Sequence, residues 1–403
     1  MPKSVQVITN ELDYINDIEK YIEEEEMDRI GIAYKNVAII GCQSSGKSTL
    51  LNILFDTDFE ELNQKDRGMA QTTKGIWVAR NSDRNILVFD IEGTDSRERG
   101  DDRMTFEQTT SLFALAIADV LIINLWTTDV GRHTASNLGL LKVIFEVNLK
   151  LFAQDQSQKK LVFVLRDFNK YENTASNLGL LKVIFEVNLK LFAQDQSQKK
   201  LVFVLRDFNK YENNEASMKE LIQGNIDEIW KQIYKDDKHL NSKASDFFNF
   251  EFVMLPHKLY QKQEFEDEGQ KLRQRFSPED INTIFPTSEP QNVPIDGLSV
   301  FIENIWKCIR ERKELNLPGE KQMVATYRCN EIKEEALEKI GEELKTLENL
   351  SVSGVIKDFE DRCRYVLKIA FDYYDESAIQ YYKQTYEKTR LDLTSEIMKK
   401  LTK

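Results

Sequence analysis

The sequence predicts an α/β domain with a mostly parallel sheet covered by helices on both faces, followed by the start of an all-α helical bundle. Over residues 34–317, short apolar runs alternate with segments whose apolar residues recur at helical spacing. This alternation is typical of parallel strands joined by crossover helices. Pro318 is the last proline, and helical spacing then takes over, as at Leu337–Leu347. We therefore expect two domains, at 1–317 and 318–403.

The individual elements follow from local patterns. An amphipathic helix is expected within residues 1–35, where Glu23–Glu26 form a solvated acidic face. Continuous short apolar runs predict strands at 34–40, 75–80, 85–89, 120–126 and 250–255. Apolar residues at helical spacing predict helices at 48–54, 106–118, 216–234 and 298–315.

Composition excludes several classes of protein. The 403 residues include 55 Lys and Arg against 68 Asp and Glu, a net charge of −13. A nucleic-acid binder with a basic surface is therefore not expected. The four cysteines form no CxxC pair and there are three histidines, which argues against a disulfide framework or a zinc site and favours a reducing cytosolic setting. The longest apolar run, Ser111–Trp126, contains Asp119 and is shorter than the ~20 residues of a membrane span.

An exact repeat occupies the middle of the chain. Residues 134–173 recur letter for letter at 174–213, which indicates a recent tandem duplication or an error in the gene model. Each copy predicts a helix followed by a strand, LVFVL. The chain thus carries one helix–strand unit more than its fold requires. We expect the displaced copy to bury its apolar strand elsewhere, since an exposed LVFVL segment would promote aggregation.

Residues 41–48, GCQSSGKS, match the phosphate-binding pattern GxxxxGK[ST] between an apolar strand and a helix. That context disfavours the alternative, a chance glycine-rich turn. The glycines let the backbone wrap a phosphate, and successive N–H groups with the helix N-terminus supply positive potential. Lys47 is expected to reach the β- and γ-phosphates, and the Ser48 hydroxyl to bind Mg²⁺. The expected nucleotide-binding residues here are Gly41, Cys42, Gln43, Ser44, Ser45, Gly46, Lys47, Ser48 and Thr49.

Two later segments carry residues that could detect whether a γ-phosphate is bound. Asp90, at the end of a strand, can hold Mg²⁺ through water, and Gly93 can offer its N–H to the γ-phosphate; a capping aspartate is the alternative. Between this segment and the P-loop, Thr73 of QTTKGIW is the preferred switch residue and Thr72 the second choice, with an ordinary Thr-rich strand start as the equal alternative. The catalytic candidates are Lys47, Ser48 and Thr73, and the metal ligands Ser48, Thr73 and Asp90.

A carboxylate that reads the base is expected at the end of a later strand. It would accept from guanine N1–H and the 2-amino group, a donor pair that adenine lacks. Each copy of the repeat offers Arg-Asp after LVFVL, as Arg166-Asp167 and Arg206-Asp207. Copy one closes the shorter loop from Trp126, so loop entropy slightly favours Asp167.

A second pattern lies just beyond these pairs. Asn169–Glu172 and its copy Asn209–Glu212 imitate the NKxD signature of small GTPases, but carry Glu where Asp is needed and lie beyond the strand ends. We interpret both as loop.

These motifs, in this order, resemble the GB/RHD-type G domains of the dynamin superfamily, and most of all the SEY/root-hair-defective group of atlastin-like GTPases. The resemblance rests on GCQSSGKSTLLNILF, QTTKGIW, DIEGTDSRERGDD, DVLIINLW, DVGR, FVLRD, FEFVMLPHKL, VPIDGLSVFIENIW and MVATYRCNEI, which follow one another in order along most of the chain. It implies a P-loop GTPase that binds GTP and Mg²⁺ and hydrolyses GTP to GDP.

The resemblance also implies roles for residues and for the whole protein. Residues 41–48 would hold the phosphates, Asp90 and Gly93 would form the second switch, and an Arg-Asp pair would read guanine. His257-Lys258 would lie near the base, although a plain surface histidine is an equal alternative. The family implies a GTP-dependent homodimer that drives homotypic fusion of endoplasmic reticulum membranes and maintains the tubular network.

Three departures from the family pattern leave alternatives open. Relatives continue into a membrane-anchoring hairpin, so contact with the endoplasmic reticulum membrane, from the cytosolic side, is expected through a region absent from this chain, which alone is expected to be soluble. Some relatives carry an arginine within the P-loop, where this chain has Gln43, Ser44 and Ser45. The candidates for a catalytic arginine elsewhere in the chain are Arg67, Arg97, Arg99 and Arg132, and a surface arginine without a catalytic role is the favoured alternative for each. The third departure is the duplication, which doubles the candidate guanine site.

Two rival functions are a dynamin-like membrane-remodelling GTPase of another type and an inactive pseudo-GTPase or scaffold whose duplication disrupts the sheet. The first would be expected to carry DxPG and TKxD, and Glu92 and the Arg-Asp pairs count against it.

Overall fold

The computed structural model describes most of the chain and packs it as two compact units. The described residues are 4–61, 73–81, 83–93, 103–126, 160–166, 199–211, 214–233, 235, 240–280, 282–285, 293–311, 317–352, 354–356 and 358–402. The first unit comprises 1–27, 33–290 and 305–315, and the second 28–32, 291–304 and 316–403. The second unit therefore includes two stretches that the sequence assigns to the first domain.

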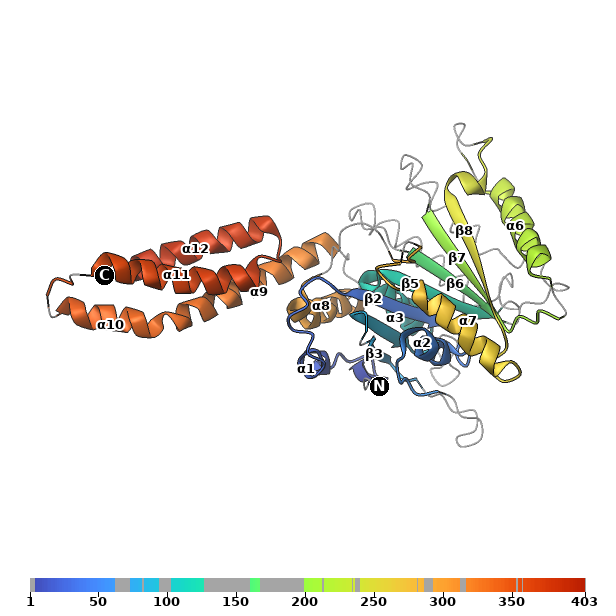
Figure 1. Cartoon of the computed structure of the whole chain (residues 1–403), viewed down its shortest axis with the longest axis horizontal. Helices are drawn as coiled ribbons and strands as arrows, with labels where there is room; N and C mark the ends of the chain where they lie inside the picture. Colours follow the sequence, from blue (N-terminus) through green and yellow to red (C-terminus); the bar gives the residue numbers. More distant parts are fainter. Residues whose placement is uncertain are drawn as a thin grey trace. The chain divides into compact units, whose positions relative to one another are not determined.

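The first unit is built on one sheet with the strand order β1-β3-β4-β2-β5-β6-β7-β8 (Figure 1). The strands are β1 Val5–Ile8, β2 Lys35–Gly41, β3 Ile76–Asn81, β4 Ile86–Ile91, β5 Val120–Trp126, β6 Lys160–Arg166, β7 Lys199–Arg206 and β8 Phe248–Leu255. β1 and β3 are antiparallel to their neighbours, whereas the pairs from β4 through β2 to β8 are parallel. The carboxyl ends of six strands thus meet at one edge, where an α/β sheet binds its ligands.

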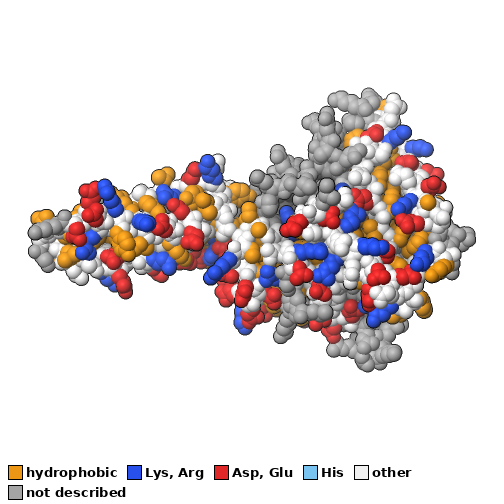
Figure 2. All heavy atoms as spheres, in the orientation of Figure 1, with side chains coloured by type: hydrophobic (Ala, Val, Ile, Leu, Met, Phe, Trp, Pro, Cys, Tyr) orange, Lys and Arg blue, Asp and Glu red, His pale blue; other side chains and the backbone are white. Residues whose placement is uncertain are grey.

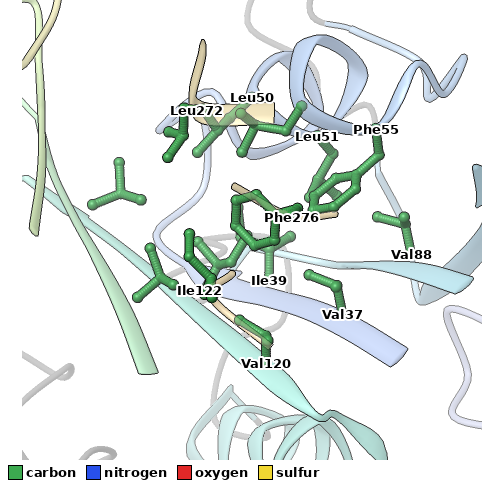
Figure 3. Packing of buried hydrophobic residues seen from close by; sticks show 14 of the residues in the cluster. Val37, Ile39, Leu50, Leu51, Phe55, Val88, Val120, Ile122, Leu272 and Phe276 are labelled. Atoms are coloured by element: carbon green, nitrogen blue, oxygen red, sulfur yellow. The ribbon is translucent and has the colours of Figure 1, made fainter. Parts of the chain in front are cut away.

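Helices cover both faces of this sheet, as predicted. They are α1 Asp17–Glu24, α2 Lys47–Phe55, α3 Arg103–Ile117, α6 Glu215–Gln232, α7 Lys262–Gln274 and the second half, residues 305–310, of α8 Leu298–Arg310. On one face, apolar residues of α2 and the end of α7 pack over alternate residues of β2, β4 and β5 (Figure 3). Each such fully buried side chain contributes about 1.5–3 kcal/mol. On the other face, Phe113 of α3 meets Trp306 of α8 edge to face, with ring centroids 5.4 Å apart.

Two parts of the first unit differ from expectation. The N-terminal segment forms the edge strand β1, paired with β3, before the short helix α1. Helix α7 was not predicted, because its sequence is mostly charged and only Phe265, Gly269 and Leu272 are buried.

The two copies of the repeat lie side by side. Strands β6 and β7 pair in parallel so that each residue faces its own duplicate, from Leu161 opposite Leu201 to Leu165 opposite Leu205. The rings of Phe163 and Phe203 stack with centroids 5.6 Å apart. The expectation that one copy would be displaced from the sheet is therefore wrong. The central LVFVL of each strand is apolar at every position, which suits the interior of a parallel sheet buried on both faces. The helices predicted for the copies lie outside the described residues.

The second unit is a bundle of helices with its own core. Its helices are α9 Leu317–Lys339, α10 Gly341–Val352, α11 Phe359–Ala378 and α12 Lys383–Leu401. The buried cluster includes Cys329, Ala370, Tyr374 and Leu393 from three of them. None of the helices in the described ranges is both long and apolar enough to cross a membrane. On the face shown in Figure 2, acidic and basic side chains are interspersed along both units.

Candidate nucleotide-binding site

The P-loop connects β2, which ends at Gly41, to α2, which begins at Lys47. A side chain at Gly41 would collide with the backbone oxygen of Asn124 on the neighbouring strand β5. Gly46 has φ +76° at the N-cap of α2, a left-handed conformation that favours glycine. These two glycines let the loop turn tightly out of the central strand and aim the first turn of α2 at the space above the sheet edge.

Buried hydrogen bonds hold the loop from beneath. The Ser45 hydroxyl donates to the Cys42 carbonyl at 2.7 Å. Asn124 donates through Nδ2 to the carbonyl of Ser45 at 3.0 Å and lies 2.7 Å from its hydroxyl oxygen. Ser45 and Asn124 are both fully buried. Sequence reasoning missed Asn124, although an asparagine within the apolar run DVLIINLW was a usable signal.

Lys47 lies inside the curve of the loop. Its Nζ donates to the carbonyls of Gly41 and Cys42 at 3.2 and 3.1 Å. Burial lowers the pKa of Lys47, while the charges of Asp90, Cys42 and Glu92 act in the opposite direction. A buried ammonium at the N-terminus of a helix adds to that helix's positive potential, so an anion bound in the loop would be strongly favoured.

Ser48, Thr73 and Asp90 come together beside Lys47. The Ser48 hydroxyl donates to Oδ2 of Asp90 at 2.6 Å, and the Thr73 hydroxyl donates to the same oxygen at 3.2 Å. The two hydroxyl oxygens lie 3.3 Å apart. Asp90 is 1 % exposed, and burial raises the pKa of its carboxyl, opposed by Lys47 and the two hydroxyls.

The same three residues offer oxygen ligands for Mg²⁺. Within the described residues, Oδ1 of Asp90 is buried and accepts no hydrogen bond, which leaves a carboxylate oxygen for a cation. Carboxylate and hydroxyl oxygens are the donors that a hard cation prefers, so the set fits Mg²⁺ held partly by water and phosphate. No cluster of three or more His, Cys, Asp or Glu suited to a metal occurs in the part of the chain that the structure describes.

The segment after β4 lies against the P-loop. A Cβ at Gly93 would come within 2.5 Å of the Cα of Gln43, so only glycine permits this approach. Glu92 accepts from the backbone N–H of Gly75 at 2.6 Å, and its own N–H donates to the Gly75 carbonyl at 2.8 Å. These bonds join the segment that carries Gly93 to the segment that carries Thr73.

Arg166 and Arg206, at the ends of β6 and β7, also contact the P-loop. Arg166 donates from Nε to Oδ2 of Asp207 at 2.9 Å, and its guanidinium lies 4.5 Å from the ring centre of Trp126. Arg206 donates to the carbonyl of Gly46 at 3.0 Å. The Asp207 side chain is 10 % exposed and its Oδ1 is 3.9 Å from Nε2 of His257. Both copies of the repeat therefore supply residues to one place.

Lys258 and Glu61 extend this cluster to α2. Oε2 of Glu61 accepts from Lys258 at 2.6 Å and from the Thr49 hydroxyl at 2.8 Å. Asn52 donates to the other oxygen at 3.2 Å. Burial acts to raise the pKa of Glu61, but the hydrogen bonds from Lys258 and Thr49 outweigh it and the net shift is downward. Sequence reasoning placed Thr49 among the nucleotide-binding residues, whereas its hydroxyl faces Glu61.

Other predicted residues lie outside the described residues. These are Asp167, Thr72 and the four candidate catalytic arginines Arg67, Arg97, Arg99 and Arg132.

The P-loop follows the central parallel strand β2, and Asp90 lies beside it at the end of the neighbouring strand β4. This arrangement, with the Asp207 carboxylate at the end of β7, is that of a P-loop GTPase. The chain matches the family described as the Root hair defective 3 GTP-binding protein (RHD3) GTPase domain over residues 40–176 and 171–318. The chain belongs to this family and carries its GTPase domain. The two matched ranges meet within the repeat.

Curated relatives are similar over almost the whole chain. Protein SEY1 homolog 1 of Trichomonas vaginalis is 37% identical over 398 residues, which cover 97% of this chain and 44% of the relative. Protein sey1 of Schizosaccharomyces japonicus is 33% identical over 395 residues, or 98% and 46%. The chain thus spans less than half the length of either. The solved structure of a bacterial selenocysteine-specific elongation factor aligns with 51% of this chain and 30% of the elongation-factor chain, at 18% sequence identity. Its TM-score of 0.25 is too low to support a structural argument.

Proposed function

We propose that this chain binds GTP and hydrolyses it to GDP in the presence of Mg²⁺. The observation that carries the proposal is the contact of Ser48 and Thr73 with Asp90 beside the buried ammonium of Lys47. These groups come from three separate segments and meet only at the carboxyl edge of the sheet. The bound cation would be held by Ser48, Thr73 and Asp90, and it would neutralise oxygens of the β- and γ-phosphates.

The residues of the chain contribute positioning and charge. Lys47 would exchange the carbonyls of Gly41 and Cys42 for phosphate oxygens and hold the charge that develops when water attacks the γ-phosphate. The N–H groups of the loop would surround the β-phosphate. Gly93, which lies against Gln43, would present its N–H to the γ-phosphate, so the Gly93 and Thr73 segments would be ordered by GTP and released by GDP.

Asp207 is the base-reading carboxylate in this proposal. Its side chain lies at the end of β7, between Arg166 and His257, on the far side of the loop from Asp90. Guanine would donate from N1–H and its 2-amino group to the two oxygens of Asp207. Loop length alone favoured Asp167, but the contacts of Asp207 with Arg166 and with His257 support copy two.

For the whole protein we propose GTP-dependent homodimerisation and fusion of endoplasmic reticulum membranes from the cytosolic side, maintaining the tubular network. The support is membership of the RHD3 family together with SEY1 relatives that are more than twice as long as this chain. Sedimentation of the chain with GDP and with a non-hydrolysable GTP analogue tests the dimer. A monomer under both conditions would contradict it for this chain.

Hydrolysis is tested with Lys47→Ala. Loss of one group that stabilises developing charge lowers a rate by about 100-fold or more, so phosphate release from GTP should nearly stop. Lys271→Ala, an exposed lysine of α7 paired with Glu268, should behave like the parent. A Lys47→Ala variant as active as the parent would overturn the site.

A further inference from the structure

Three successive carbonyl groups of the P-loop accept hydrogen bonds from arginines of the repeat. Arg166 donates to the carbonyl of Ser44 at 3.4 Å. Arg206 donates through one nitrogen, Nη1, to two carbonyls, that of Ser45 at 3.4 Å and that of Gly46 at 3.0 Å. The side of the loop that faces the sheet is therefore lined by guanidinium groups.

The two arginines converge on one glycine. A Cβ at Gly46 would lie 3.2 Å from both terminal nitrogens of Arg206 and 3.3 Å from Nη1 of Arg166. Arg206 is 3 % exposed and its Nε has no hydrogen-bond partner among the described residues. Burial, with the positive charge of Arg166, lowers the pKa of Arg206 to about 10, against the opposing charges of Asp207 and Glu61. Two such close cations raise the positive potential beneath the loop.

The two guanidinium groups differ in their partners, although they occupy the same position of identical segments. Besides its 3.4 Å contact with the Ser44 carbonyl, Arg166 donates from Nε to the carboxylate of Asp207 at 2.9 Å and stacks on Trp126, so its shortest hydrogen bond is on the base side. Arg206 is directed to the Ser45–Gly46 and Gly46–Lys47 peptide groups. A donor on a peptide carbonyl polarises the N–H of the same peptide group, and those N–H groups belong to Gly46 and Lys47.

We propose that the duplication has divided one role between two arginines: Arg206 is a positioning residue for the phosphates, acting through the peptide groups of the P-loop, and Arg166 is a positioning residue for the base, acting through Asp207. The inference rests on the proposed nucleotide function. Arg206 would strengthen binding of phosphate groups whatever the base, and Arg166 would sharpen the choice of base whatever the number of phosphates.

Calorimetric titration with three nucleotides separates the two roles. GDP and GMP differ by one phosphate, and GDP and inosine diphosphate differ by the 2-amino group. Arg206→Gln should weaken GDP binding by about tenfold, weaken GMP binding less, and leave the ratio of GDP to inosine diphosphate affinity unchanged. Arg166→Gln should reduce that ratio and leave the ratio of GDP to GMP affinity closer to the parent's. Arg273→Gln, a half-buried arginine of α7 paired with Asp83, should match the parent in both ratios.

A purely structural role would move neither ratio. If Arg206→Gln weakened GDP, GMP and inosine diphosphate by the same factor, or if the two variants changed the same ratio, the division of roles would be refuted. Arg206→Lys keeps the charge on a single donor nitrogen and should fall between the parent and Arg206→Gln. It carries the same test if the glutamine variant does not fold. If the parent binds no GDP, the proposed function fails instead.

Discussion

The hydroxyl oxygen of Ser48 and Oδ2 of Asp90 lie 2.6 Å apart, a contact that joins the first turn of α2 to the end of β4. It brings together two motifs separated by the whole of β3 and the segment that carries Thr73. The free oxygen of Asp90 and the hydroxyl of Ser48 thus lie where a cation and the phosphates it neutralises would meet.

Removal of the Ser48 hydroxyl should weaken the binding of this cation. We expect Ser48→Ala to raise the Mg²⁺ concentration for half-maximal GTP hydrolysis by about tenfold or more, since disturbing the groups around a bound metal typically costs that much affinity. The measurement is the rate of phosphate release across a Mg²⁺ titration. Ser395→Ala, at an exposed position of α12, is the control. An unchanged half-maximal concentration would remove Ser48 from the metal site.

Exchange of the Asp207 carboxylate for an amide should alter the preferred base. Asparagine presents one acceptor and one donor, so it matches xanthine, which has an oxygen where guanine has the 2-amino group. We expect Asp207→Asn to bind GDP at least about tenfold more weakly and to gain affinity for xanthosine diphosphate. Fluorescence competition measures both. Asp227→Asn on α6 should keep the parent's preference, and the same behaviour of Asp207→Asn would exclude this copy as the base reader.

The Glu61–Lys258 ion pair predicts a pH-dependent contribution to stability. The pKa of Glu61 in the folded chain is below its ordinary value of 4.5, so its stabilisation is complete above that value and is lost as pH falls through the folded pKa. We expect Glu61→Gln to lower the free energy of unfolding by about 1 kcal/mol at pH 7. The difference from the parent should shrink below pH 4.5.

Urea unfolding at several pH values tests this expectation. Glu360→Gln removes one carboxylate of an exposed pair with Arg364 on α11 and should differ little from the parent at any pH. A Glu61→Gln deficit that persisted undiminished in acid would show that the pair is not the cause.

A buried tyrosine anchors the second unit. Tyr381 donates to Oδ1 of Asp296 at 2.7 Å, and Arg328 donates to the other oxygen at 2.9 Å. Burial and the charge of Asp296 raise the pKa of Tyr381, so the phenol is neutral and a donor. Tyr381→Phe leaves Oδ1 of the partly buried Asp296 carboxylate without that donor and should lower the stability of this unit by about 1–3 kcal/mol. Thermal unfolding compares it with Tyr365→Phe, whose ring is 55% exposed; equal midpoints would contradict the prediction.

Most of the fold was predictable, because its signals are local. The P-loop pattern identified Lys47 and Ser48, and Asp90 and Thr73 do meet Ser48. Pairing across the sheet was harder to predict. Nothing in residues 5–8 shows that this short segment completes the sheet edge through β3, and α7 buries too few apolar residues to display a helical stripe.

The residues that sequence reasoning missed act through long-range contacts. Asn124 supports Ser45 from another strand, and Glu61 accepts a hydrogen bond from Lys258, which lies 197 positions away. Arg166 and Asp207 were assigned to rival sites, because one strand pattern appeared twice and loop length alone was used to choose between the copies. Adjacent, in-register pairing makes them partners instead.

The pairing of β6 with its duplicate β7 also makes the repeat a removable module. β5 pairs with Leu161–Leu165 and β8 with the identical Leu201–Leu205, so excision of either 40-residue copy would leave each neighbour beside the strand sequence that it already meets. Inward and outward residues would keep their alternation, and one inter-strand interface would vanish. A lineage could gain or lose this segment in a single genetic event without rewriting any flanking residue.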